Sequence, residues 1–164
     1  MRRQDKKLRD EDRISKLLSE ATIGRLGTVG PDGPMIKPVN YVYQNGSFYF
    51  HGALEGEKMD HIRADPRVVF QVERIQRYIK SAGKPCDSSQ AYECVIARGR
   101  AEVVDDPAEK TAALNALMEK HQPEGGWTPV TEAMAETVAV VSVRVERMTA
   151  KTSPKPILRA EKED

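Results

Sequence analysis

The strongest chemical signal in the sequence is a segment in which strand-like residues give way to helix-like ones. Phe50-His51-Gly52-Ala53 is followed closely by Gly56-Glu57-Lys58. The first amides of a helix have no partner within it, Gly52 allows close approach to the backbone, and Lys58 adds a point charge. These features together indicate a phosphate-binding site. On the residues alone, the alternative that His51 and Lys58 are ordinary solvent-exposed side chains stays open.

His51 offers a second kind of chemistry. Strand alternation places it opposite Phe48 and Phe50, so the imidazole faces outward if the two phenylalanines fill the core. An unperturbed pKa of about 6.5 lets a histidine carry a proton near neutral pH. His51 therefore either donates a proton to a bound acceptor or only hydrogen-bonds a phosphate, and both roles stay open.

Other common catalytic patterns are not recognisable. The sequence contains no paired carboxylates, Ser-His-Asp triad, P-loop or metal-ligand spacing, and no metal site is predicted. Cys86 and Cys94 are the only cysteines. Two cysteines are too few for a zinc site or a disulfide framework, so both are predicted to be reduced thiols.

Composition narrows the class of protein. The chain has 164 residues, with 26 Lys plus Arg against 25 Asp plus Glu and a formal net charge of +1. So small a charge gives no global field for gripping a polyanion, which argues against nucleic acid as a partner. The length favours a single domain. No apolar run approaches the roughly 20 residues that cross a bilayer, and the charged beginning does not resemble a signal peptide, so a cytoplasmic protein is expected.

The elements that must position the site begin with one helix and a meander. Apolar residues from Ile14 to Ala21 are spaced as on one helix face, and the charged stretch 1–13 before them is expected to be a flexible arm. From Ile23 the apolar period changes to two. The pattern predicts strands at 23–29, 35–43 and 47–53, joined by a Gly/Pro turn and by Asn45-Gly46.

The rest of the sequence completes a mainly β, α+β fold. Pro38 cannot donate to a ladder, so it predicts an edge, a bulge or a ligand contact. Six strands and three helices are predicted in all, without a βαβ repeat, which favours a six-stranded antiparallel closed or split β-barrel with peripheral helices. The remaining segments are a helix at 56–64, strands at 67–73, 92–104 and 138–148, a loop at 80–90, a helix from Pro107, and a mobile tail at 152–164.

Several motifs in order resemble the pyridoxamine 5'-phosphate oxidase-like flavin-binding split barrels, and within them the 5-nitroimidazole resistance branch. Each fragment alone is weak, but the order and spacing are specific, and they cover the chain from residue 1 to about 151. The motifs are Ile23-Gly24-Arg25-Leu26-Gly27-Thr28, Asp32-Gly33-Pro34, Lys37-Pro38-Val39-Asn40-Tyr41-Val42-Tyr43, Phe50-His51-Gly52-Ala53 with Gly56 and Lys58, Asp65-Pro66-Arg67-Val68, and Gly99-Arg100-Ala101-Glu102.

The resemblance implies one FMN-binding domain over residues 1–151, forming a homodimer with FMN in a groove between subunits. Carried over position by position, the backbone of Pro38, Val39, Asn40 and Tyr41 would lie along the isoalloxazine ring. His51, Gly52 and Ala53 would lie by the phosphate end, with Lys58 neutralising the phosphate. Cys94 stands where related sequences often carry Ser or Gln beside the pyrimidine edge of the ring, and a thiol is a weaker hydrogen-bonding group than either.

The family pattern also suggests an activity. We expect an oxidoreductase that passes electrons from a nicotinamide cofactor, NAD(P)H, through FMN to a small aromatic acceptor such as a nitroimidazole, with His51 as the candidate catalytic residue. The family's Arg-rich motif for pyridoxal phosphate is not visible at the C-terminal end, so oxidation of vitamin B6 is not expected. The alternative is a non-catalytic protein that stores or senses flavin, or that holds haem through His51.

Overall fold

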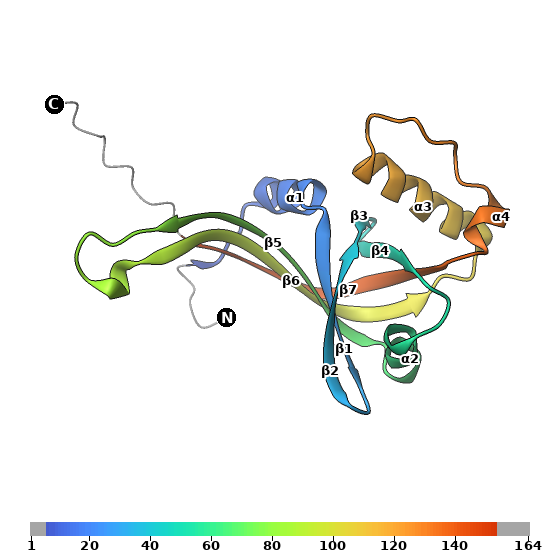
Figure 1. Ribbon diagram of the computed structural model, residues 1–164, viewed down its shortest axis with the longest axis horizontal. Helices are drawn as coiled ribbons and strands as arrows, with labels where there is room; N and C mark the ends of the chain where they lie inside the picture. The colour runs from blue at the N-terminus through green and yellow to red at the C-terminus, as the bar shows by residue number, and fades with distance from the viewer. Residues whose placement is uncertain (1–5, 154–164) are drawn as a thin grey trace.

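The protein is built around one antiparallel sheet of seven strands. We analysed a computed structural model, which describes residues 6–153 (Figure 1). The strand order in the sheet is β2-β1-β5-β6-β7-β4-β3. The strands are β1 (Ile23–Gly30), β2 (Gly33–Asn40), β3 (Val42–Gln44), β4 (Ser47–Gly52), β5 (Arg67–Ile79), β6 (Ser89–Val103) and β7 (Ala139–Thr152).

The connection between β2 and β3 curls the sheet on itself. These strands form its two edges, yet only Tyr41 separates them in the sequence. One residue cannot span an open seven-stranded sheet, because neighbouring strands lie about 4.8 Å apart. The sheet must therefore bend until its edges meet, and β2 contacts β4 accordingly. The predicted antiparallel barrel with peripheral helices is confirmed.

The predicted count of six strands was low by one. The stretch predicted as one strand from 35 to 43 is divided at Tyr41, whose backbone lies outside both β2 and β3. The division has a steric cause, since the Tyr41 side chain turns into the core and is fully buried there. Alternation and turn residues do not mark such a bend.

Three aromatic rings form the centre of the barrel. The Phe48 and Phe70 rings are stacked with centroids 4.3 Å apart, and Tyr41 meets both edge-on at 5.5 and 5.4 Å. Each of the three side chains is fully buried. Such pairs contribute about 0.5–1.5 kcal/mol beyond the burial of their area. The core thereby fixes the course of β4, which leads to the candidate site.

Between residues 6 and 153, four α-helices and a short 3-10 turn at Pro85–Asp87 accompany the sheet. Asp10 caps α1 by accepting from the amide of Arg13 at 3.1 Å, and Asp106 with Pro107 opens α3 as the sequence predicts. α4 was not predicted, because four residues give no periodic signal. The helices are α1 (Glu11–Glu20), α2 (Glu57–Ala64), α3 (Pro107–His121) and α4 (Glu132–Ala135), and the 3-10 turn η2 spans Pro85–Asp87.

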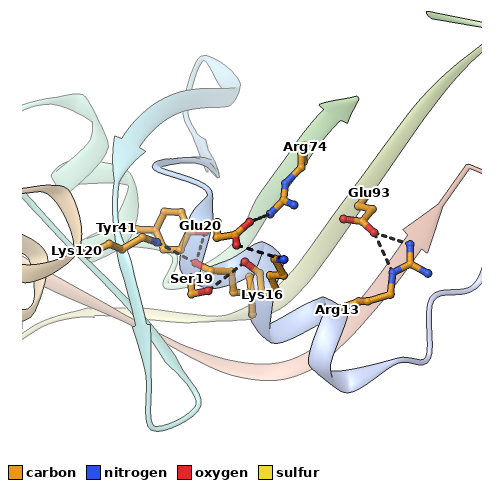
Figure 2. A network of polar contacts seen from close by, with 9 residues as sticks. Arg13, Lys16, Ser19, Glu20, Tyr41, Arg74, Glu93 and Lys120 are labelled. Carbon is orange, nitrogen blue, oxygen red and sulfur yellow. Dashed lines mark hydrogen bonds and ion pairs between the residues drawn. The ribbon is translucent and has the colours of Figure 1, made fainter. Parts of the chain in front are cut away.

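Helix α1 is tied to the sheet by ion pairs at two points (Figure 2). Arg13 donates from Nε to Oε1 of the buried Glu93 on β6 at 3.1 Å, and Arg74 on β5 pairs with Glu20 at 2.7 Å. Glu11 to Arg13 thus belong to the helix rather than to the predicted arm, and Leu8 before them is buried.

Helix α3 reaches the end of α1 through Lys120 (Figure 2). The Leu18 carbonyl accepts from Nζ of Lys120 at 2.9 Å and from the Tyr41 hydroxyl at 2.8 Å. Nζ also lies 3.6 Å from the centroid of the Tyr41 ring. Carbonyls in the last turn of a helix lack partners within it. Lys120 and Tyr41 both donate to one of these carbonyls, that of Leu18. We call Leu18, Tyr41 and Lys120 the α1–α3 clamp.

Three strands extend further than the sequence predicted. β5 continues to Ile79 rather than stopping at Glu73, and β6 begins at Ser89, so the loop between them is shorter than 80–90. β7 runs to Thr152, the first residue of the predicted mobile tail. Ser153, also in the predicted tail, is buried. Residues 154–164 of that tail and residues 1–5 of the predicted arm lie outside the described residues.

Candidate functional site

A groove of about 300 Å³ opens where β4 ends and α2 begins, facing the edge strand β2. It brings together three of the residues predicted to bind the cofactor, Pro38, Ala53 and Lys58. Lys37 from β2 and the acidic residues beside α2 complete the wall. The full lining is Lys37, Pro38, Ala53, Glu55, Gly56, Glu57 and Lys58.

Gly52 leaves the space that the Lys58 ammonium uses. A Cβ at position 52 would lie 2.7 Å from Nζ of Lys58, closer than real Cβ contacts. Nζ also lies 5.1 Å from the centroid of the Phe50 ring, on the same face of β4. The half-buried Lys58 is therefore held against the end of β4 rather than extended into solvent.

Two lysines and two glutamates line the groove, so an anion would have to contact the lysines directly to be favoured there. Burial lowers the pKa of Lys58, and the charge of Lys37 lowers it further. Lys37 lies 3.8 Å from Glu57, and both of these side chains are about half exposed, so the pair is well screened by solvent. An anion between the two ammonium groups would offset both the desolvation of Lys58 and the repulsion between the lysines.

The start of α2 adds backbone donors to this groove. Gly56 precedes the helix with φ of +114°, a conformation that side-chain-bearing residues rarely adopt. Its carbonyl accepts from the amides of Met59 and Asp60 at 2.8 and 3.1 Å. Within residues 6–153, no side chain caps the first turn of α2. The amides that open the helix are thus available to a ligand, and the helix dipole favours negative charge there.

His51 lies on the other face of β4. Phe48 and Phe50 are fully buried, as predicted, and His51 points outward and is exposed. It is not among the residues that line the groove. Partial burial lowers the pKa of His51, and the charges of Lys58 and His121 lower it further. At neutral pH the imidazole is therefore mainly uncharged.

The predicted ring-contacting segment divides into exposed and buried positions. Pro38 and Asn40 are exposed, whereas Val39 and Tyr41 have their side chains in the core. The Tyr41 carbonyl already accepts from Nε2 of His121 at 3.1 Å. The backbone around Pro38 and Asn40 is thus the part of this segment most accessible to a ligand.

Cys94 is not among the residues that line the groove. Its neighbour Val95 lies in one cross-strand row, through β5 and β1, with Val39 on β2. Neighbouring strands lie about 4.8 Å apart, so this row spans about 15 Å from β6 to the part of β2 that lines the groove. The half-buried Cys94 lies beside Glu73; burial raises the pKa of its thiol and the Glu73 charge raises it further.

Sequence reasoning missed two basic residues, Lys37 and His121. Lys37 lies two residues before the buried Val39, so a lysine at a core-facing strand position was the available signal. His121, at the end of α3, contacts the Tyr41 carbonyl between β2 and β3. Only tertiary structure brings it there, and no local pattern predicts it.

The residues present fit the phosphate end of a flavin mononucleotide. The groove provides two ammonium groups, an uncapped helix start and, at Gly52, a position where a side chain would displace Lys58. A phosphate monoester is a dianion that accepts several hydrogen bonds, and this donor set matches it. Across 6–153, no three His, Cys, Asp or Glu side chains are grouped to hold a metal ion.

Comparison with known proteins finds one matching family and several solved structures with the same fold. The family model for pyridoxamine 5'-phosphate oxidase matches residues 10–152. A candidate 5-nitroimidazole antibiotic resistance protein from Bacteroides thetaiotaomicron is 25% identical, with a TM-score of 0.76 over 88% of this chain and 85% of that one. No curated protein matches the sequence significantly.

Two other solved structures share the fold at lower identity. A flavocytochrome from Azotobacter vinelandii is 19% identical, with a TM-score of 0.83 over 95% of this chain and 73% of that one. An FAD- and haem-binding protein from Mycobacterium smegmatis is 15% identical, with a TM-score of 0.81 over 92% and 74%. Among the helices of the described region, none combines the length and apolar character needed to span a bilayer.

Proposed function

The chain belongs to the pyridoxamine 5'-phosphate oxidase family, and on that premise we propose that it is an FMN-binding oxidoreductase. The bound FMN would carry electrons from a nicotinamide cofactor to a small aromatic acceptor such as a nitroimidazole. One observation on a similar protein supports a flavin, and another supports a nitroimidazole as the acceptor. The similar Mycobacterium smegmatis protein binds FAD, and the similar Bacteroides protein is linked to 5-nitroimidazole resistance.

The observation that carries the proposal is the juxtaposition of Gly52 and Lys58. A glycine whose Cβ would meet the ammonium at 2.7 Å leaves room for a charged donor at the very end of β4. Lys58 and Lys37 bind the phosphate in our account, and the first amides of α2 orient it. The exposed backbone of Pro38 and Asn40 then lies along the ring. Redox chemistry belongs to the flavin, and the chain supplies binding, orientation and charge.

We propose further that the working form is a homodimer. The outer face of the sheet exposes an apolar row, in which Ile36 is 70% and Val69 is 37% exposed on either side of Gly27. A groove of about 520 Å³ runs along this face.

The visible absorption spectrum of the purified protein tests the cofactor. We expect flavin bands and release of FMN on denaturation. A Soret band instead would favour haem held through His51, and a colourless protein that cannot be reconstituted with FMN would contradict the proposal. Oxidation of NADPH that is stimulated by a nitroimidazole would then establish turnover rather than storage.

A further inference from the structure

His61 is a buried histidine that the proposed function does not use. It lies on α2 with only 4% of its surface exposed, and its Nδ1 is hydrogen-bonded to Oγ1 of Thr28 on β1 at 3.0 Å. Thr28 is itself only 2% exposed. This bond therefore joins two side chains that solvent does not reach, directly between α2 and the sheet.

Gly30 on β1 leaves space for the imidazole ring of His61. A Cβ at Gly30 would lie 1.9 Å from Nε2 of His61, so the imidazole occupies the space that any other residue at position 30 would fill. Gly52 and Lys58 show the same arrangement at the other end of this helix. Helix α2 thus contacts the sheet through two side chains, His61 and Lys58, and each packs against a glycine of a different strand.

These two contacts, at Lys58 and His61, are about one helical turn apart. His61 follows Lys58 by three residues, so the hydrogen bond to Thr28 and the Lys58 ammonium belong to consecutive turns. The other buried contacts of α2 are made by Met59 and Ile62. Apolar contacts are not directional, whereas a hydrogen bond fixes both distance and angle. The His61–Thr28 bond is therefore the contact that sets the rotation and height of α2 against the barrel.

We propose that His61 is a positioning residue for phosphate recognition: by fixing α2 on β1 through Thr28, it holds the Lys58 ammonium and the opening amides of α2 in register with the end of β4. This inference rests on the proposed function, because it concerns how the phosphate groove is kept in shape. A merely structural His61 would contribute stability alone. A positioning His61 also contributes to the preference for FMN over riboflavin, which differ by the phosphate.

The test is the ratio of FMN to riboflavin affinity, measured by fluorescence quenching of the two flavins on each variant of the full chain. His61→Leu and Thr28→Val each remove the bond by replacing a polar side chain with an apolar one of similar size. His61→Asn restores it, because its amide lies where Nδ1 lies in the histidine. The matched control is Ile62→Val, which weakens the packing of the same helix without touching the bond.

We expect the ratio to fall about tenfold in His61→Leu and Thr28→Val, the lower end of what losing a charge-assisted hydrogen bond costs. His61→Asn should recover most of the ratio, and Ile62→Val should keep it although its melting temperature falls. An unchanged ratio in Thr28→Val overturns the inference even if His61→Leu does not fold. A wild-type protein without any preference for FMN overturns the proposed phosphate site, and the inference with it.

Discussion

Lys58 is the residue on which phosphate recognition depends most directly. Its ammonium is half-buried, it lies against Gly52 and Phe50, and burial together with Lys37 lowers its pKa. The charged form of Lys58 is disfavoured in the protein without ligand, and a bound phosphate dianion would offset this unfavourable free energy. The interaction should therefore appear in ligand affinity more than in stability.

Replacing Lys58 with alanine should separate FMN from riboflavin. A charge-assisted contact contributes about 1.5–3 kcal/mol, so Lys58→Ala should weaken FMN about tenfold or more and leave riboflavin unchanged. Isothermal titration with both ligands measures this. Lys84→Ala, which removes an exposed lysine from the loop between β5 and β6, is the control. An equal loss for FMN and riboflavin would show that Lys58 does not contact the phosphate.

The lowered pKa of His51 predicts how turnover depends on pH. Its pKa is lowered from the ordinary 6.5 by burial, Lys58 and His121, so the protonated form that can donate a proton accumulates only below that value. Turnover per bound flavin should accordingly fall as the pH rises from 5 to 7.5, and His51→Gln should remove this dependence and lower turnover about tenfold at pH 5. Steady-state rates at both pH values measure it. A His51→Gln variant that keeps the wild-type pH profile would exclude proton donation by His51.

Among single residues, local chemistry was easier to predict from the sequence than tertiary partners were. Phe50, His51, Gly52 and Lys58 could be placed because a strand that alternates and a helix that follows leave few arrangements. The outward face of His51 was correct for that reason. That Gly52 faces Lys58, while His51 lies on the opposite face, depends on how α2 returns over the strand end. That return is set by the His61–Thr28 bond, which no local pattern signals.

At the scale of elements, the α1–α3 clamp joins the two helices beside the barrel mouth. Burial lowers the pKa of Lys120 to about 8, and its ammonium is held by the Leu18 carbonyl and the Tyr41 ring. In the unfolded chain the same lysine titrates near its ordinary 10.5. Between these values the unfolded state binds more protons than the native state, so the contribution of Lys120 to stability increases with pH.

Comparing wild type with Lys120→Met isolates this effect. Below pH 8 both states of the wild-type lysine are protonated, and the difference in unfolding free energy between the two proteins should be constant. From pH 8 to 9.5 the wild type should gain stability relative to Lys120→Met. Urea denaturation at pH 7, 8.5 and 9.5 measures the difference. The range stops there because the raised pKa of Tyr41 acts in the opposite sense once tyrosine ionises in the unfolded chain. A difference that does not vary with pH contradicts the assignment.

Elements with strong end signals were predicted well, and elements shaped by the barrel were not. Asp106-Pro107 predicts the start of α3, and Asn45-Gly46 predicts the turn between β3 and β4, because both signals are local. The break between β2 and β3 arises from closure of the whole sheet around Tyr41. The extension of β5 to Ile79 arises from pairing with β6. Neither is marked by a local sequence pattern.

At the scale of the whole molecule, the proposed dimer follows from what a single chain leaves exposed. The row Ile36–Gly27–Val69 presents apolar side chains on the outer face of β2, β1 and β5. Ile36 is 70% exposed, so a charge there would be harmless in a monomer. The same charge would be buried without a partner in a dimer that uses this face.

Ile36→Glu should therefore convert the dimer into a monomer and lower flavin content in parallel. Met134→Glu is the control, because Met134 is similarly exposed at 53% but lies on α4. Light scattering coupled to size exclusion, with the flavin absorbance recorded on the same peak, measures mass and cofactor together. A wild-type protein that is monomeric at micromolar concentration would contradict the dimer and the proposed site between subunits.

The central claim is that this chain recognises a flavin through its phosphate, at the groove between β4 and α2. Titration of flavin-free wild-type protein with FMN and with riboflavin tests it most directly, since the two ligands share the ring and differ at the phosphate. We expect one FMN to bind per chain, with an affinity about tenfold or more above that of riboflavin. Equal affinity for the two flavins, or no binding of either, would contradict it.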